Sequence, residues 1–158
     1  MIRSKGLTLI ELLFCLLIIT LLLVSLSFGL SIHQKNKAQI RENDLKMAIY
    51  YARNMALLKG KPLVLTPLTD SDWSTGMMLF IDNKTHRYSP ETQLIHQWQW
   101  HKEIKITWHG FYSDQYLLFS PDLAHAAITG HFNLQKGDGS QVKLIINRLG
   151  RVRKAMET

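Results

Sequence analysis

A long apolar stretch near the N-terminus constrains this 158-residue chain more than any other feature. It runs from Leu7 to Ile32, and a helix of these 26 residues, at about 1.5 Å per residue, is long enough to cross a hydrocarbon core of roughly 30 Å. A basic leader, Met1 to Gly6, precedes it. One carboxylate, Glu11, lies inside it, and a charge at membrane depth costs about 3 kcal/mol on insertion scales. We therefore expect a transmembrane helix over residues 7–32 in which Glu11 meets a positive partner.

Three interpretations account for such a start. A cleaved secretory signal peptide has a shorter apolar region, of about 7 to 15 residues, followed by small residues at the cleavage site, and neither feature is clear here. A plain single-span anchor explains the length but assigns no role to Glu11. The third interpretation is a resemblance: Lys5-Gly6-Leu7-Thr8-Leu9-Ile10-Glu11-Leu12-Leu13 resembles the class III signal of type IV pilins and type II secretion pseudopilins.

This resemblance implies that prepilin peptidase cuts between Gly6 and Leu7 on the cytoplasmic side, although the residue after the cut is usually phenylalanine in the family. The new N-terminus is methylated in the family, and Glu11 is expected to meet the N-terminal amine of a neighbouring subunit during assembly. An ion pair in a low-dielectric helix bundle relieves the desolvation penalty of the carboxylate only in the correct register. A protonated Glu11 that faces lipid is the alternative. The implied location is the bacterial inner membrane, with a single pass and a periplasmic C-terminal domain, and then the pilus at the cell surface.

The remaining residues, 33–158, are enough for one domain with a single core. Cys15 is the only cysteine, so no intrachain disulfide can form. Apolar side chains at helical spacing predict an amphipathic helix over 33–59, which Gly60 and Pro62 end. No proline interrupts residues 7–59, so the span and this stretch are compatible with one long helix. The expected core-facing positions are Ile40, Leu45, Ala48, Ile49, Ala52, Met55 and Ala56.

The second half of the chain, residues 62–154, is predicted to be rich in β-strands. Short runs of β-branched, aromatic and leucine residues are separated by turn residues, and 136–140 is a hairpin signal because its glycines permit positive φ. Ile104, Ile106 and Trp108 alternate with polar residues and should face the core. With a helix first and strands after it, the fold class is α+β. The expected strands are 63–68, 76–82, 103–109, 115–120, 130–135 and 141–147.

Several landmarks of this half resemble the GspH/FimT group, which joins the type II secretion minor pseudopilin H with the type IV minor pilin FimT. They are Trp73, Gly76, Phe80 and Asp82, then Phe119-Ser120-Pro121, then Gly150-Arg151-Val152-Arg153. The resemblance implies the type IV pilin fold, in which a long N-terminal helix packs against antiparallel β-sheets. From the residues alone, Trp73 and Phe80 are expected to be core residues.

No enzymatic site is indicated by the sequence. The seven histidines show no close metal-ligand spacing, and there is no glycine-rich phosphate loop or nucleophile elbow, so we expect no catalytic residue, cofactor or metal. The densest aromatic cluster, His96 to His101, is expected to be an alternating strand or loop with half-buried tryptophans, and stacking on a ligand or nucleotide is its alternative.

The C-terminus carries a dense basic segment. Five positive charges fall within twelve residues without an acidic residue among them, and the formal net charge of +7 becomes +5 once Arg3 and Lys5 leave with the leader. A solvated basic edge is one interpretation, and a phosphate-binding surface is the other, because arginine offers a planar fork of donors to phosphate oxygens. The basic residues are Lys143, Arg148, Arg151, Arg153 and Lys154.

Gly150-Arg151-Val152-Arg153 resembles the Gly-Arg-x-Arg motif that links FimT-type minor pilins to DNA uptake in natural transformation. The resemblance implies a minor pilin that is built into the pilus beside other pilins and binds DNA without base reading, so binding should be salt-sensitive. Gly150 would let the chain turn, and Arg151 and Arg153 would project to one side if this end is extended. The alternative function is an H-type minor pseudopilin of a type II secretion system.

Overall fold

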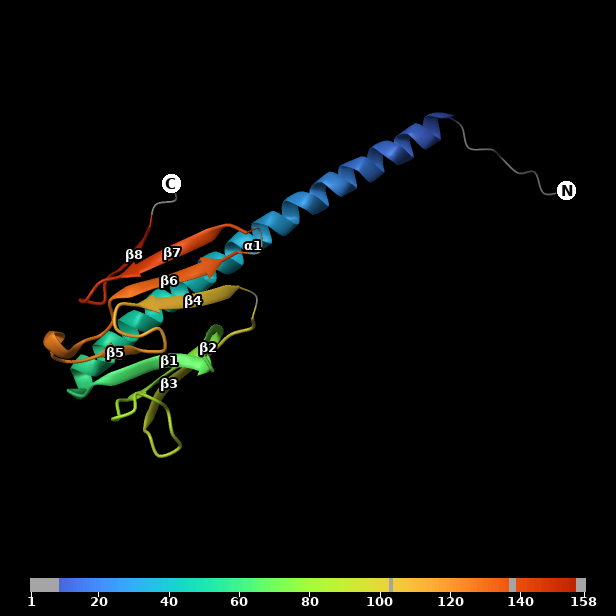
Figure 1. Ribbon diagram of the computed structural model, residues 1–158. Coiled ribbons are helices and arrows are strands. Elements are labelled where there is room, and N and C mark those ends of the chain that lie inside the picture. The colour runs from blue at the N-terminus through green and yellow to red at the C-terminus, as the bar shows by residue number, and fades with distance from the viewer. Residues whose placement is uncertain (1–8, 103, 137–138, 156–158) are drawn as a thin grey trace.

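The computed structural model describes residues 9–102, 104–136 and 139–155, including every side chain in these ranges except those of 24–36 and 123. The α+β class is confirmed: one long α-helix precedes two antiparallel sheets (Figure 1). The described elements are α1 (Leu9–Lys59), β1 (Leu63–Thr69), β2 (Asp72–Ile81), β3 (Leu94–Gln99), β4 (Lys105–Gly110), β5 (Leu117–Phe119), the short 3-10 helix η1 (Leu123–His125), β6 (Gly130–Gln135), β7 (Gln141–Ile146) and β8 (Val152–Lys154).

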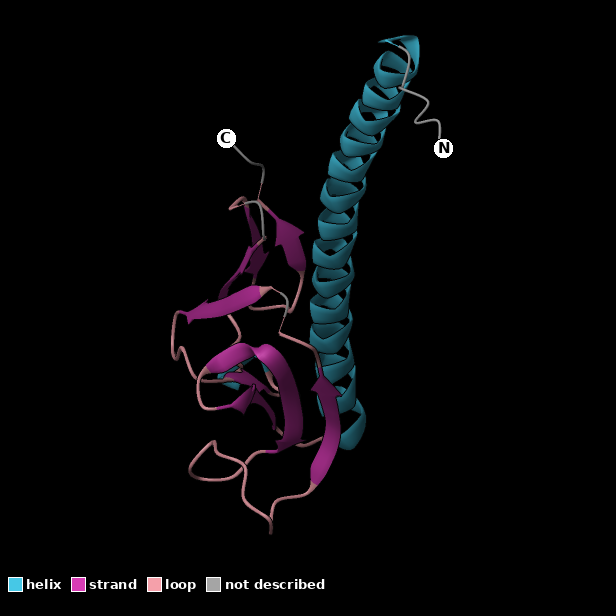
Figure 2. Ribbon diagram, turned by 90° about the vertical axis from the view of Figure 1, so that its right-hand side faces the viewer, coloured by secondary structure: helices cyan, strands magenta, loops and turns pink. Residues whose placement is uncertain are grey.

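Helix α1 is continuous, as the absence of proline between residues 7 and 59 allows. It ends where the sequence predicts, because Gly60 adopts a φ of +61°, a left-handed conformation that favours glycine, and donates its N–H to the carbonyl of Leu57 at 3.3 Å. Its N-terminal half projects beyond the sheets, while its C-terminal half lies along one side of both of them (Figures 1 and 2).

The two sheets have the strand orders β3-β2-β1-β5 and β4-β6-β7-β8. The predicted hairpin at 136–140 is confirmed, since β6 and β7 pair with Gln135 opposite Gln141. Two strands extend the sequence-based assignment: the aromatic segment after residue 93 forms the edge strand β3, and Val152–Lys154 forms the edge strand β8. Lys143, Arg153 and Lys154 of the basic C-terminal segment are therefore held in a sheet, whereas Arg148 and Arg151 lie in the turn between β7 and β8.

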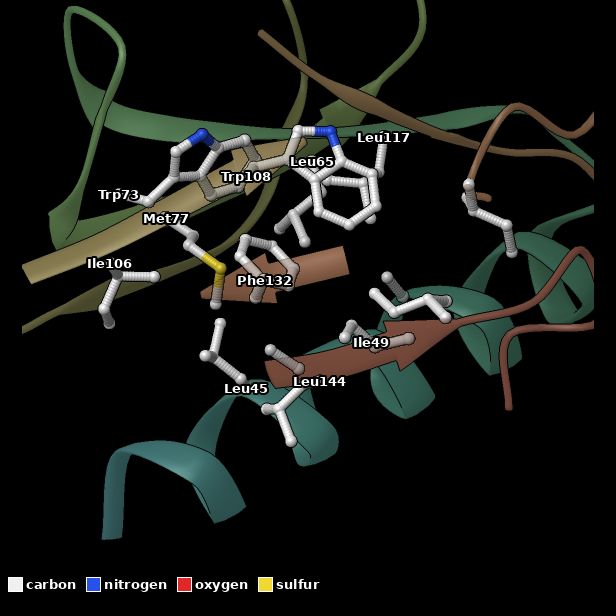
Figure 3. Close-up of a cluster of buried hydrophobic side chains, with 14 of the residues drawn as sticks. Leu45, Ile49, Leu65, Trp73, Met77, Ile106, Trp108, Leu117, Phe132 and Leu144 are labelled. Carbon is white, nitrogen blue, oxygen red and sulfur yellow. The ribbon is translucent and has the colours of Figure 1, made fainter. Parts of the chain in front are cut away.

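The core lies between the C-terminal half of α1 and the two sheets. Leu45 and Ile49 of the helix approach Phe132 and Leu144 of the second sheet (Figure 3), and each fully buried side chain of this kind stabilises the fold by about 1.5–3 kcal/mol. Ile104, Ile106 and Trp108 are buried, as are Trp73 and Phe80, so these core predictions are confirmed.

One helix position was predicted wrongly. Ile40 is 55% exposed, whereas Ala38 and Glu42 are buried. The buried positions 38, 42, 45, 49, 52 and 56 follow alternating steps of four and three, and residue 40 lies on the opposite side of that stripe. Glu42, a carboxylate, thus lies on the sheet-facing side of α1, and Ile40, two residues before it, lies on the exposed side.

Candidate nucleic-acid interface

The turn that joins β7 to β8 is built around Asn147. The side-chain oxygen Oδ1 of Asn147 accepts hydrogen bonds from the backbone N–H groups of Leu149 at 3.0 Å and Arg151 at 2.9 Å. Its backbone N–H donates to the carbonyl of Arg151 at 3.1 Å, and its carbonyl accepts from Gly150 at 2.9 Å. Asparagine suits this place because its short amide bonds to backbone groups a few residues ahead. These four hydrogen bonds define the path of the turn and therefore the position at which the following arginines start.

Gly150 brings this turn against helix α1. The chain turns there with a φ of +75°, and a Cβ added at this position would lie 3.0 Å from Cδ of Arg53. A side chain at residue 150 would meet both backbone strain and the Arg53 stem. The glycine of the Gly-Arg-x-Arg segment thus has a second role that the sequence did not suggest, which is close packing against an arginine of the helix.

A groove of about 570 Å³ lies between α1 and this C-terminal turn. We call it the C-terminal groove. Among the residues that the structure describes, four of those that line the groove are basic, one is aromatic and none is acidic, so this lining presents positive charge beside apolar surface. It is lined by Lys46, Tyr50, Arg53, Asn54, Leu149, Gly150, Arg151, Val152 and Arg153.

Strand alternation separates the two basic residues at the end of β8. Arg153 lies opposite Ile145, whose side chain is exposed, and Lys154 lies opposite Leu144, whose side chain is buried. Because residues directly opposite each other in a sheet share a face, Arg153 belongs to the solvent face and Lys154 to the face that meets the helix. Strand β8 is at the edge of its sheet, and Arg153 lines the C-terminal groove at that edge.

Lys154 is engaged by a buried carboxylate. Its Nζ lies 3.2 Å from Oε2 of Glu42, and Nζ of Lys46 lies 2.6 Å from Oε1 of the same residue. Burial raises the pKa of the Glu42 carboxyl, but the hydrogen bonds and charges of Lys46 and Lys154 outweigh it and leave that pKa below its ordinary value. Lys154 and Lys46 are thus partly neutralised, and Glu42 joins β8 to α1.

Lys143 lies on the solvent face of the second sheet, away from the C-terminal groove. It is opposite Asn133, and the next positions along the same face are His131 and Ile145, which are opposite each other. Burial lowers the pKa of His131, and the nearby charges of Lys143 and His109 lower it further. Lys143 therefore extends the basic character of the sheet face, together with Arg153, without lining the groove.

Arg148 lies at the tip of the turn and connects it to η1. Its Nη2 donates to the carbonyl of Ala124 at 2.7 Å. The backbone N–H of Ala124 and the ring of His125 hold the pKa of Asp122 below its usual range, and the Arg148 charge acts in the same direction. Of the five basic residues named from the sequence, the structure thus places only Arg151 and Arg153 along the groove.

The helix side of the groove was not predicted from the sequence. Lys46, Tyr50 and Arg53 stand at steps of four and three, which places them on one face of α1. That spacing was available in the sequence, but nothing in it indicated that residues 149–153 would lie alongside. The buried Glu42 was missed for the same reason, because its two lysine partners include one that is 112 residues away.

The predicted N-terminal site is only partly described. Gly6 and Leu7 lie outside the described residues, and Glu11 lies on the projecting half of α1, where its neighbours Ile10 and Leu12 are exposed. Among the residues that the structure describes, no helix is long and apolar enough to cross a membrane. No group of three or more histidine, cysteine or acidic residues that could hold a metal is present in those same residues.

Comparisons with known proteins place the chain in a structural context. A sequence model of the family described as "Type II transport protein GspH" matches residues 43–150. Two crystal structures of the type IV minor pilin FimU from Pseudomonas aeruginosa are similar in fold. In one, the TM-score is 0.60 at 17% identity, over 77% of this chain and 90% of FimU. In the other, the TM-score is 0.57 at 18% identity, over 75% of this chain and 92% of FimU. No curated protein sequence matches the chain significantly.

Proposed function

This chain belongs to the GspH family of type IV pilin-like proteins, and from that premise we propose that it is a minor type IV pilin that holds DNA in its C-terminal groove and promotes DNA uptake. The family membership and the pilin fold account for the long helix and its packing against two sheets. DNA binding is the further step, and it rests on the charges of this particular chain.

The proposed route to the pilus uses the N-terminal segment. Residues 7–32 insert into the inner membrane with residues 33–158 in the periplasm, and prepilin peptidase removes Met1 to Gly6. The mature helix then joins other pilins, with Glu11 in register with the N-terminal amine of a neighbour. Intact-mass measurement of the protein extracted from membranes tests this route, because a wild-type mass that still includes residues 1–6 would contradict it.

The observation that carries the DNA proposal is the composition of the C-terminal groove. Arg151 and Arg153 come from the C-terminal segment and Arg53 comes from α1, and in the described part of the chain no carboxylate lines the space between them. Guanidinium groups bind phosphate oxygens through paired N–H donors, so three of them along one groove can follow a nucleic-acid backbone. Such contacts carry no sequence information, and we therefore propose that binding is independent of sequence.

A salt titration of DNA binding tests this proposal. Three phosphate contacts imply a slope of log affinity against log salt of roughly −2.7 on duplex DNA. The double substitution Arg151→Gln and Arg153→Gln should weaken binding to all duplex sequences alike and flatten the slope by about 1.8. A matched control, Lys84→Gln with Arg87→Gln, removes the same charge from two exposed residues in the β2–β3 connection and should leave the affinity within about twofold. If both double variants bind as wild type does, the basic end is a solvated edge.

A minor pseudopilin of a type II secretion system is the second candidate function. The description of the matching family as a type II transport protein favours it. In a strain that carries both systems, deletion of the gene should then reduce exoprotein secretion and leave transformation unchanged. The DNA-uptake proposal predicts the opposite pair of outcomes.

A further inference from the structure

We propose that the C-terminal groove prefers unpaired nucleotides, with a base stacked on Tyr50 while Arg53, Arg151 and Arg153 hold the flanking phosphates. This inference rests on the proposed DNA-binding function and specifies its substrate class. It adds single-stranded DNA, or the unpaired end of a duplex, as the preferred ligand and Tyr50 as the residue that selects it.

The position of Tyr50 carries the inference. Tyr50 is 66% exposed although it lies between basic residues, with Lys46 four residues before it and Arg53 three residues after it on the same helix face. Leu149, which is 47% exposed, lines the same groove from the C-terminal turn. An aromatic ring and an aliphatic side chain thus present apolar surface to solvent at a place where phosphate binding alone would need only cations.

The chemistry of the two forms of DNA differs at this surface. In a duplex the faces of the bases are stacked on one another, so a duplex lying across the groove offers phosphates to the arginines but no base face to Tyr50. An unpaired base has an accessible face, and stacking of one base on an aromatic side chain is worth about 1–3 kcal/mol and tolerates any base. Tyr50 therefore adds affinity for unpaired DNA only.

The size of the groove agrees with this assignment. Its volume of about 570 Å³ lies within the range of roughly 300–1,000 Å³ that is typical of sites for small organic ligands. An unpaired nucleotide can enter such a space, whereas a duplex can only rest on its rim. Asn54, which also lines the groove, supplies an amide with both donors and an acceptor that can bond to the edge of an entering base without selecting one base.

Fluorescence anisotropy with the full-length protein in detergent micelles tests the inference. The probes are a labelled oligo-dT, an abasic oligonucleotide of equal length, and a duplex. Wild type should bind oligo-dT roughly 5- to 150-fold more tightly than the abasic strand, which keeps the phosphates and lacks the bases. Tyr50→Ala should abolish most of that difference and change duplex affinity by less than about twofold, whereas Tyr50→Phe should retain it.

A matched control is Tyr112→Ala, which removes another exposed tyrosine, 60% exposed, from the β4–β5 connection. It should leave all three affinities unchanged. The inference is overturned if Tyr50→Ala has no effect on oligo-dT binding, or if it weakens duplex and single-strand binding equally. In either case duplex binding that depends on Arg151 would leave the proposed DNA function standing, whereas wild type that binds none of the probes would overturn both.

Discussion

The two halves of helix α1 are alike in backbone and opposite in surroundings. In the N-terminal half, from Leu9 to Leu23, the large apolar side chains are exposed, with Leu16 55% exposed and Leu21 62% exposed. In the C-terminal half, Leu45 and Ile49 are completely buried against the sheets. The helix is uninterrupted between them, so helix formation alone does not distinguish the two.

The difference shows that the C-terminal half of α1 is covered by the sheets of this chain, whereas the N-terminal half leaves its apolar side chains uncovered. Monomeric soluble proteins rarely expose contiguous apolar surface on this scale, and such surface marks contact with other proteins or with lipid. The buried half packs against the sheets of the same chain, and its buried carboxylate, Glu42, forms ion pairs with Lys46 and Lys154. Substitutions in the two halves should accordingly have different consequences.

The largest expected effect is a loss of stability in the buried half. Leu45→Ala should lower the free energy of unfolding by about 2–5 kcal/mol, because it removes buried methyl groups and leaves a cavity in the core. Leu16→Ala, the same change in the exposed half, should alter it by less than about 0.5 kcal/mol. Urea denaturation of the full chain in detergent micelles measures both. Equal losses would mean that the two halves do not differ as described.

Glu42→Gln should have the next largest effect, about 1–3 kcal/mol, because it removes a charge that is hydrogen-bonded to Lys46 and Lys154. The folded-state pKa of Glu42 lies below its ordinary value of 4.5, so its contribution is complete above that pH and is lost as the pH falls through the lower folded value. Unfolding curves at a series of acidic pH values should therefore converge for variant and wild type. A difference that grows toward low pH would contradict this assignment.

Glu11→Ala is expected to reduce incorporation into pili severalfold while leaving the domain stable. The substitution removes the carboxylate that we propose meets a neighbouring subunit, and it makes membrane insertion easier. The ratio of variant to wild type in sheared pilus fractions, normalised to the amount in the membrane, measures the effect. Equal ratios would support a Glu11 that faces lipid.

Lys154→Gln should have the smallest effect on DNA. Lys154 is turned toward Glu42, so its loss should weaken DNA binding by less than about twofold and cost about 0–1 kcal/mol of stability, since its side chain is 44% exposed. Arg151→Gln in the same assay should weaken binding clearly more. A Lys154 variant as impaired as the Arg151 variant would show that β8 presents both residues to DNA.

Much of the fold was predictable because its signals are local. The apolar stripe through Leu45 and Ile49, the glycine that ends α1 and the hairpin after β6 all depend on residues a few positions apart. Ile40 was wrongly predicted to face the core because it is an apolar residue close to the buried stripe. It precedes Leu45 by five residues, a spacing that places the two on different faces of a helix, and the sheets cover the face of Leu45. Strand β3 was left open between strand and loop, since an edge strand buries only part of its alternating residues.

The residues of the candidate site likewise divide into those that could be predicted from the sequence and those that could not. Its C-terminal arginines and Gly150 were selected from the sequence, because a cluster of charge and a glycine are visible in a short segment. Lys154 was grouped with them because it is a neighbour in sequence, but strand alternation turns it to the opposite face. Arg53 and Tyr50 were absent from that selection, although their spacing on the helix was visible.

The sequence by itself determined the apolar character of the N-terminal half of α1, the α+β class and the basic character of the C-terminal segment, because each follows from periodicity or composition within a short stretch. Only the tertiary structure decided which basic residues act together. It set Arg53 against Gly150 and joined Lys154 to Glu42, 112 residues away, through the packing of β8 beside α1. Contacts of that kind depend on the docking of two distant elements, which neither element specifies alone.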